Sequence, residues 1–203
     1  GGPKATTVPV GEYAGFGGRA MTSAIVSKEV PPLCHPLGAE NKLVIAPGLL
    51  SGTAGAQSGR ISVGGKSPLT GGIKESNSGG QASQVLAKLG YSAIVLEGKP
   101  ASDDLYKIFI NKDGVKITKD NSLKMLGNYD LVEKMKKEFG DKMCCISIGP
   151  AGEMKMGGDE GQEQAVQETR GGVVELTDAR PFHAPSPGHD AQLGEKRAPR
   201  GHE

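Results

Sequence analysis

The residues best suited to chemistry lie in one stretch, residues 58–80, which reads SGRISVGGKSPLTGGIKESNSGG. It is dense in glycine and serine, carries Arg60 and two lysines, and has a single acidic residue, Glu75. Glycine lets backbone N–H groups approach a ligand because it has no Cβ, and an arginine can grip a phosphate through two parallel N–H bonds. A helix expected directly after the stretch would point its N-terminus, which favours anions, toward it. The stretch therefore predicts a site for a phosphate-bearing ligand.

Two common nucleotide motifs do not account for this stretch. The P-loop pattern G-x-x-x-x-G-K-[ST] could end at Gly65-Lys66-Ser67, but its first position then holds Arg60 instead of glycine. No G-x-G-x-x-G opens a helix after a strand here, so the dinucleotide fingerprint is absent as well. On composition alone, a series of tight turns between β-strands explains the glycines equally well.

Other charged residues near the stretch receive a more ordinary interpretation. Arg19, in the segment GGRA, is a candidate for a second anion contact, although a solvated helix start explains it more simply. Lys66, Lys74 and Glu75 lie in the expected loop, where charged side chains are usually solvated. No catalytic acid, base or nucleophile is assigned.

The cysteines indicate neither a disulfide framework nor a metal site. There are three of them, Cys34, Cys144 and Cys145, and they lack the spacing of a zinc site. Cys34 precedes His35, but no second such pair completes a ligand set. Free cysteine usually behaves as a small buried hydrophobe, and that is the role we expect.

The helix after the stretch is the element that the sequence indicates most clearly. Apolar residues recur at i, i+3, i+4 and i+7 between residues 82 and 89, and a glycine follows as a stop. Ser76, Asn77 or Ser78 could cap its first turn. Its N-terminus is therefore expected at the end of the glycine-rich stretch, near Asn77–Gly80.

The rest of the chain alternates short apolar strands with amphipathic helices. Further helices are predicted over residues 20–26 and 131–139, a loop over 149–152, and a hairpin turn at Asp113-Gly114. The predicted strands are 41–47, 61–63, 91–97, 106–110, 115–117 and 143–148. Mixed strands with a hairpin and two or three flanking helices predict an α+β fold with largely antiparallel sheets.

Composition argues against several classes of partner. The formal net charge of the 203 residues is +1, which gives no general attraction to nucleic acid or to an anionic membrane. The chain has no tryptophan and few aromatic residues, so base-stacking platforms are not expected. No apolar run reaches a membrane span, and no leader pattern opens the sequence. A cytoplasmic protein is the default expectation.

Several further segments share a family resemblance with the glycine-rich stretch. They are FGGRAMTSAIV, PLGAENKLVIAPGLLSGT, LAKLGYSAIVLEGKP and ISIGPAGEMKM. Together with SGRISVGGKSPLTGGIKESNSGG, and in this order, they resemble the N-terminal domain of the tungsten-containing aldehyde:ferredoxin oxidoreductases over about residues 11–156. Residues 1–156 are accordingly expected to form one cofactor-binding domain that lacks the first strand of the family.

The C-terminal part of the sequence departs from the family. Residues 157–203 are rich in Gly, Glu, Gln, Pro and His and lack a sustained apolar period, so a largely disordered tail is predicted. Only VVEL, residues 173–176, could form a strand, and it would have no partner strand.

The resemblance also implies a cofactor and a reaction. The family holds tungsten between the dithiolenes of two pterins, oxidises an aldehyde to a carboxylic acid and passes the electrons to ferredoxin. The positions that match the family's motifs imply that Arg60 would contact a pterin phosphate. Asn77, Ser78, Gly79 and Gly80 would lie against the cofactor. A magnesium ion would bridge the two phosphates and bind the Asn77 backbone carbonyl. The four-iron, four-sulfur cluster belongs to C-terminal domains that this chain lacks.

Three hypotheses about function follow. The chain is the cofactor base of an aldehyde oxidoreductase and inactive alone, or a stand-alone module that binds a phosphorylated ligand, or a non-functional remnant. Ferredoxin and an aldehyde are the partners expected at the level of the family, and a homodimer is one assembly that the chain could adopt.

Overall fold

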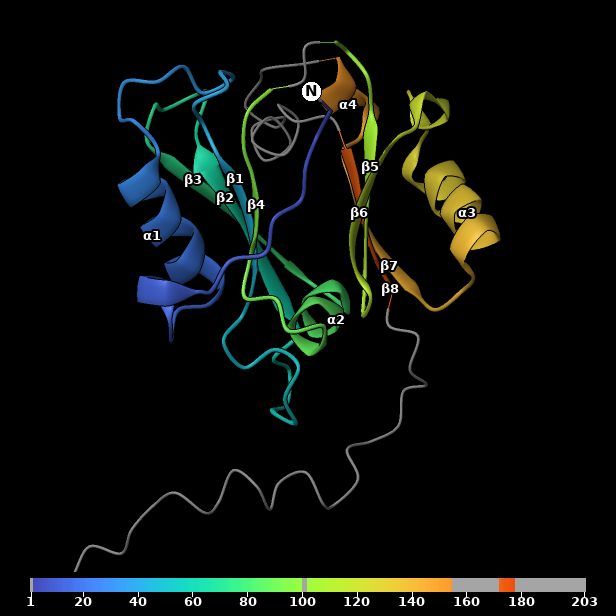
Figure 1. Cartoon of the computed structure of the whole chain (residues 1–203), viewed down its shortest axis with the longest axis horizontal. Helices are drawn as coiled ribbons and strands as arrows, with labels where there is room; N and C mark the ends of the chain where they lie inside the picture. The colour runs from blue at the N-terminus through green and yellow to red at the C-terminus, as the bar shows by residue number, and fades with distance from the viewer. Residues whose placement is uncertain (1, 100–101, 155–171, 178–203) are drawn as a thin grey trace, which may run out of the picture.

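Two four-stranded sheets face each other in the computed structural model, which describes residues 2–99, 102–154 and 172–177 (Figure 1). In the first, sheet A, the strands lie in the order β3-β2-β1-β4 and all neighbours are antiparallel. Its strands are β1 (Leu43–Pro47), β2 (Arg60–Lys66), β3 (Ile73–Gly79) and β4 (Ile94–Leu96). β3 is therefore an edge strand of sheet A.

Sheet B has the order β6-β5-β8-β7. The pairs β5–β6 and β7–β8 are antiparallel, whereas β8 runs parallel to β5. The strands are β5 (Tyr106–Asn111), β6 (Gly114–Lys119), β7 (Met143–Ser147) and β8 (Gly172–Thr177). One of its central strands thus comes from a segment more than sixty residues after the other.

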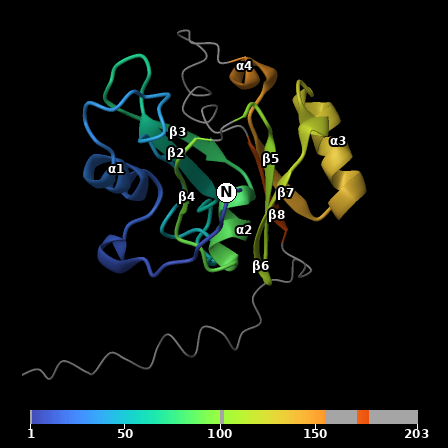
Figure 2. The ribbon, with the colours of Figure 1, turned by 45° about the horizontal axis from the view of Figure 1, so that its top comes forward.

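Helices cover the outer faces of both sheets, in the order α1, sheet A, sheet B, α3 (Figures 1 and 2). α1 (Gly18–Glu29) packs on β1 and β2, and α3 (Asn128–Phe139) packs beside β7. α2 (Ala82–Lys88) contacts both sheets, and the one-turn helix α4 (Pro150–Glu153) follows β7. Two short 3-10 turns, η1 (Gly11–Tyr13) and η2 (Asn121–Leu123), complete the described elements. No helix in these described ranges has the length and apolar character needed to cross a bilayer.

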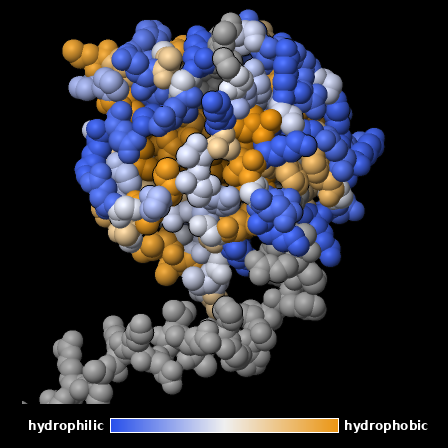
Figure 3. Space-filling view, viewed as in Figure 1, coloured by the Kyte–Doolittle hydropathy of each residue, from blue (hydrophilic) through white to orange (hydrophobic). Residues whose placement is uncertain are grey.

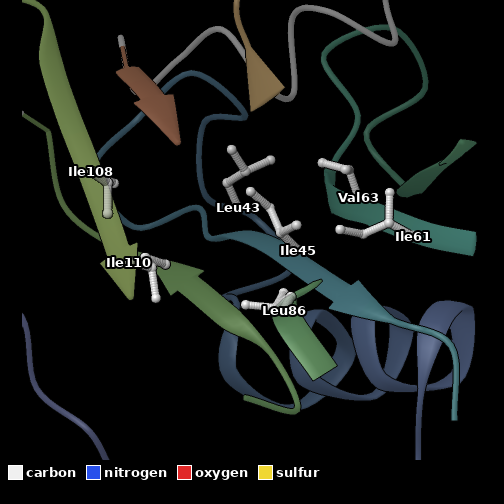
Figure 4. Packing of buried hydrophobic residues seen from close by; sticks show 7 residues of the cluster. All are labelled: Leu43, Ile45, Ile61, Val63, Leu86, Ile108 and Ile110. Carbon is white, nitrogen blue, oxygen red and sulfur yellow. The ribbon is translucent and has the colours of Figure 1, made fainter. Parts of the chain in front are cut away.

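The central core fills the space between the sheets. It is made of seven buried residues, shown in Figure 4: Leu43, Ile45, Ile61, Val63, Leu86, Ile108 and Ile110. Smaller clusters lie under α1, around Met21 and Ile25, and under α3, around Leu131 and Met135. Hydrophilic residues dominate the rim of the face seen in Figure 3, and apolar residues gather near its middle. The N-terminal segment before η1 runs across this face in front of the sheets (Figure 1).

The α+β class with largely antiparallel sheets is confirmed. The strand at 41–47, the hairpin around Asp113-Gly114, the helix at 131–139 and the strand at 143–148 all form, with shifts of a few residues at their ends. α1 is longer than predicted and runs from Gly18 to Glu29, between the extended N-cap residue Gly17 and Pro31. Residues 150–153 form a helical turn where a loop was predicted.

The expectation for residues 173–176 is wrong on one point. These residues belong to β8, which has partners on both sides, β5 and β7. Three of the four residues in VVEL are apolar, which suits a strand between two others, but the sequence cannot show which distant strands will pair with it. The rest of the predicted disordered tail lies outside the described residues.

Candidate functional site

The glycine-rich stretch is a β-hairpin, and one face of it carries three of the predicted site residues. Arg60 lies opposite Gly79 in the β2–β3 ladder, and Ser62 lies opposite Asn77. Directly opposed residues present their side chains on the same face, so Arg60, Asn77 and Gly79 share a face. This is the face that α1 covers, because the same side of Gly64 touches Thr22 of α1.

The expected loop and helix start are therefore wrong for this stretch. Ser76 to Gly79 pair with Val63 to Arg60 of β2, which holds them in extended conformation. α2 begins only at Ala82, its N-cap is Gln81, and no side chain caps it. The ladder to β2 overrides the helix-capping preference of the short polar side chains in this segment.

A chain of side-chain hydrogen bonds fixes the Arg60 guanidinium. Its Nε donates to Asn77 Oδ1, and Asn77 Nδ2 donates to Ser62 Oγ at 3.0 Å. Ser62 is buried, whereas Arg60 and Asn77 are exposed. The terminal Nη atoms of Arg60 make no hydrogen bond to any part of the chain that the structure describes. The guanidinium is thus oriented through Nε, and its outer N–H groups remain available to an anion.

Gly79 provides the space in which this guanidinium lies. A Cβ placed on Gly79 would be 3.7 Å from Arg60 Nη1, which is ordinary contact, and any longer side chain would compete with the guanidinium. The next residue, Gly80, has a φ of +131°, in the region that favours glycine. Its N–H donates to the Gly59 carbonyl at 3.0 Å, which continues the pairing beyond Arg60 and Gly79 at the open end of the hairpin.

The backbone of Asn77 is directed toward the open edge of sheet A. The bond between Gly59 and Gly80 marks a hydrogen-bonded pair, and such pairs alternate with non-hydrogen-bonded ones along an antiparallel ladder. Asn77 and Ser62 therefore form a non-hydrogen-bonded pair. Because β3 is an edge strand, the Asn77 carbonyl faces away from β2. A backbone oxygen in this position suits a hard cation such as Mg²⁺.

Ser78 stands apart from the other predicted site residues. It lies opposite Ile61, whose side chain belongs to the central core, so Ser78 is on the other face of the hairpin from Arg60. Its hydroxyl donates to the neighbouring Gly79 carbonyl at 3.2 Å. The structure brings Arg60, Asn77 and Gly79 together and leaves Ser78 outside the group. A cofactor contact by Ser78 stays a prediction.

The loop before β2 is anchored by residues that the sequence did not single out. Gly48 N–H donates to the Arg60 carbonyl at 2.9 Å, and Ser51 Oγ donates to the Ser58 carbonyl at 2.7 Å. Gln84 of α2 donates to Ser58 Oγ at 3.0 Å. These contacts fix the entry to β2 and hence the position of Arg60. Nothing in the local sequence marks Gln84, since its partners are more than twenty residues away.

Lys66 is buried and Glu75 is partly buried, contrary to the expectation that both are solvated. Lys66 is 7% exposed, and its Nζ donates to the Pro32 carbonyl. The Glu75 side chain is 10% exposed, and its Oε2 accepts from Arg19 Nε at 3.0 Å. Both point to the α1 side of sheet A, where α1 and the turn after it cover the hairpin. The two-residue period of a strand places Lys66 and Glu75 on the face that α1 covers, but the sequence does not indicate a strand at these positions.

Metal ligation by side chains finds no support in the described residues. No group of three or more His, Cys, Asp or Glu residues in them could hold an ion. Cys34 is buried under α1, as expected of a small hydrophobe, and Cys144 and Cys145 are partly buried in β7. Burial raises the pKa of the Cys144 thiol, which makes its reactive thiolate less available.

Comparisons with known proteins agree on one family. The sequence model of the family "Aldehyde ferredoxin oxidoreductase, N-terminal domain" matches residues 4–173. Tungsten-containing aldehyde ferredoxin oxidoreductases from Thermococcus kodakarensis and Pyrococcus furiosus are each 41% identical to the chain over 139 residues, 68% of this chain and 23% of theirs. The enzyme of that name from Pyrococcus horikoshii is 42% identical over 144 residues. The chain spans about a quarter of the length of these curated relatives.

The fold also resembles that of a solved structure. The active site complex BamBC of benzoyl coenzyme A reductase, in complex with 1,5-dienoyl-CoA, contains a chain that superposes with a TM-score of 0.72 at 31% sequence identity. The match covers 79% of this chain and 26% of that chain.

Proposed function

This chain belongs to the family of the aldehyde ferredoxin oxidoreductase N-terminal domain, and from that premise we propose that it forms the base on which a tungsten bis-pterin cofactor lies. Its proposed part is to bind the cofactor phosphates. The complete enzyme would oxidise an aldehyde to a carboxylic acid and pass the electrons to ferredoxin, and this chain alone would be inactive. An iron–sulfur cluster would lie in domains beyond it. Location in the cytoplasm and assembly as a homodimer stay predictions.

The observation that carries the proposal is the orientation of Arg60. Asn77 fixes the guanidinium through Nε, and Gly79 leaves room for it. The remaining N–H groups form the planar fork that matches a phosphate. A phosphate bound there would lie at the open edge of β3, on the side to which the Asn77 carbonyl is directed. That carbonyl is the group proposed to bind the bridging magnesium ion.

The residues present suit the phosphates of such a cofactor better than its redox centre. The face near Arg60 offers donors, a backbone oxygen and glycine, and no acid, base or nucleophile of this chain is proposed to act on the aldehyde. When bound, the tungsten centre supplies the two-electron oxidation. The chain's own residues bind and orient the phosphate end, and the groups that act on the substrate would come from the rest of the enzyme.

The proposal is tested by replacing Arg60. We expect Arg60→Ala to weaken binding of pyrophosphate to the 203-residue chain, measured by isothermal titration calorimetry, by about 1.5 kcal/mol. This is the lower end of the range for a charged hydrogen bond, because the side chain is exposed. Lys28→Ala, an exposed cation at the far end of α1, is the control and should leave the affinity unchanged. Equal affinities of the Arg60→Ala and unmodified chains would refute the role of Arg60.

The cofactor itself is tested by measuring tungsten and pterin in the purified chain beside a thermal melt. Stoichiometric pterin with tungsten would mean that this domain holds the cofactor unaided. A cooperative melt without pterin, combined with pyrophosphate binding, would favour a half-site that needs the other domains. Tight binding of other phosphorylated ligands would favour a stand-alone module, and the absence of a melt would support a non-functional remnant.

A further inference from the structure

We propose that Arg19 is a second anion-binding residue of this site, held in position by Glu75, so that Arg19 and Arg60 together bind a ligand with two phosphate groups. This inference rests on the proposed function, because it extends the Arg60 site. The family resemblance assigns no role to Glu75, and the sequence alone favours a solvated helix start for Arg19.

Arg19 and Arg60 are each held through Nε by a side chain of strand β3. Glu75 and Asn77 are two residues apart on β3, so their side chains lie on the same face, about 7 Å apart. Glu75 accepts from Arg19 Nε, and Asn77 accepts from Arg60 Nε. In the described residues, neither arginine uses its terminal Nη atoms in a hydrogen bond to the chain. Two oriented guanidinium groups thus stand side by side along the edge strand.

Close packing of α1 on the hairpin brings Arg19 to this face. A Cβ on Gly64 would be 2.6 Å from Thr22 Cβ, and a Cβ on Gly18 would be 3.5 Å from Ser62 Oγ. Ser62 is the residue that accepts from Asn77, so the first turn of α1 lies against the Arg60 group. The N-cap of this 12-residue helix is Gly17, which has no side chain to cap it, and the N-terminal dipole of the helix adds to the attraction for an anion.

The burial of Glu75 distinguishes this pair from an ordinary surface salt bridge. Exposed ion pairs add little to stability, and here only Arg19 is exposed, with 75% of its side chain accessible. The Glu75 side chain is 10% exposed, and among the described residues its buried Oε1 atom has no hydrogen-bond partner. A buried carboxylate oxygen without a partner is costly. We infer that the carboxylate serves to orient Arg19.

The experiment measures pyrophosphate affinity of the 203-residue chain by calorimetry at low salt. We expect Arg19→Ala to weaken binding about tenfold, as does Arg60→Ala, whereas Lys28→Ala leaves it unchanged. Lys28 is a matched control because it lies on the same helix, is exposed and also pairs with a carboxylate, Glu12. Arg19→Lys keeps the charge but loses the fork, and it should recover only part of the affinity.

The outcomes separate the two proposals. Weaker binding in Arg60→Ala with no change in Arg19→Ala would overturn this inference and leave the proposed function standing. No change in Arg60→Ala would overturn the proposed function. If the unmodified chain does not bind pyrophosphate, the two-arginine site is refuted.

Replacing Glu75 tests the positioning role through the sign of the effect. Removal of a negative charge alone would strengthen anion binding, whereas loss of the group that orients Arg19 would weaken it. We therefore expect Glu75→Ala to bind pyrophosphate several-fold more weakly while its thermal melt stays cooperative. Unchanged or tighter binding would overturn the role of Glu75.

Discussion

The two hairpins of the molecule, β2–β3 and β5–β6, have similar topology and opposite character. The β5–β6 hairpin turns through two residues and contributes Ile108 and Ile110 to the central core. The β2–β3 hairpin turns through six residues, is built largely of glycine, serine and charged residues, and lies at the edge of its sheet. The β5–β6 hairpin stabilises the fold through the central core, whereas the β2–β3 hairpin places polar groups at the edge of sheet A.

The difference shows how a strand can form without an apolar pattern of its own. β3 buries little apolar surface, yet it pairs along seven residues because β2 beside it is anchored on both faces. Ile61 and Val63 of β2 pack into the central core, and Gly64 packs against α1. The polar strand is thus supported by its neighbour, and the side chains of Glu75 and Asn77 each accept a hydrogen bond from an arginine. Mutations in the two hairpins should therefore affect different properties.

The largest effect is expected at the core hairpin. Ile110 is 1% exposed, and Ile110→Ala should lower the free energy of unfolding by about 2–5 kcal/mol, since it leaves a cavity between the sheets. Urea denaturation measures the loss. Ile73→Ala, in the other hairpin and 47% exposed, is the control and should change stability by less than about 0.5 kcal/mol. Similar losses in both variants would contradict the division of roles.

An intermediate effect is expected where α1 meets the polar hairpin. Gly64→Ala would place a methyl group 2.6 Å from Thr22 Cβ, and it should cost about 1–3 kcal/mol of stability by forcing α1 away from β2. Urea denaturation measures the loss of stability, and pyrophosphate titration measures whether the displacement of α1 also changes anion binding. Gly72→Ala, in the turn of the same hairpin, meets its nearest atom at 3.6 Å and should be close to neutral. A neutral Gly64→Ala would show that the helix contact is looser than described.

The smallest effect is a loss of stability at low pH, and it should be similar beside sheet A and beside sheet B. The ammonium of Lys42 and then the hydroxyl of Tyr13 bond to Glu29 beside sheet A and lower its pKa. Asn121, then Lys119 and Ser102, hold the pKa of Asp104 beside sheet B well below its usual range. A carboxylate with a lowered pKa in the folded state stabilises the fold above its unfolded pKa, which is about 4. That contribution is lost as the pH falls through the lower, folded value.

Melting temperatures between pH 7 and pH 2.5 measure this effect. Glu29→Gln and Asp104→Asn should each melt below the unmodified chain at pH 7, and the gap should narrow below about pH 4. For Glu29 the expected difference is under about 1 kcal/mol, because the pair is partly exposed. A gap that is constant down to pH 2.5 would show that charge is not the cause.

Periodic segments of the chain could be predicted because the spacing of apolar residues within each segment indicates which face is buried. The helix around Leu131 and Met135 places its apolar residues on one face, and the β5–β6 strands alternate around a two-residue turn. The proposed site residues Arg60, Asn77 and Gly79 were predicted from their chemistry and from family resemblance. Their clustering on one face depends on register, which the sequence of the hairpin does not reveal because it lacks apolar alternation.

The rest depends on contacts between distant segments. The Glu75 side chain is only 10% exposed because α1, more than fifty residues earlier, covers it through Arg19. Lys66 is buried by the turn at Pro32. β8 is a strand because β5 and β7 accept it on either side. In each case the local residues permit several structures, and the tertiary partner selects one.

The position of β8 inside sheet B also sets an order for folding during synthesis. All four strands of sheet A lie before residue 97 and pair in antiparallel fashion, so this half can form as soon as those residues are available. Sheet B must wait for residues 172–177, because β5 and β7 are joined only through β8. Long-range parallel pairing is slow. The half that carries Arg60 and Asn77 is therefore expected to be built first, and the half that covers its inner face is completed last.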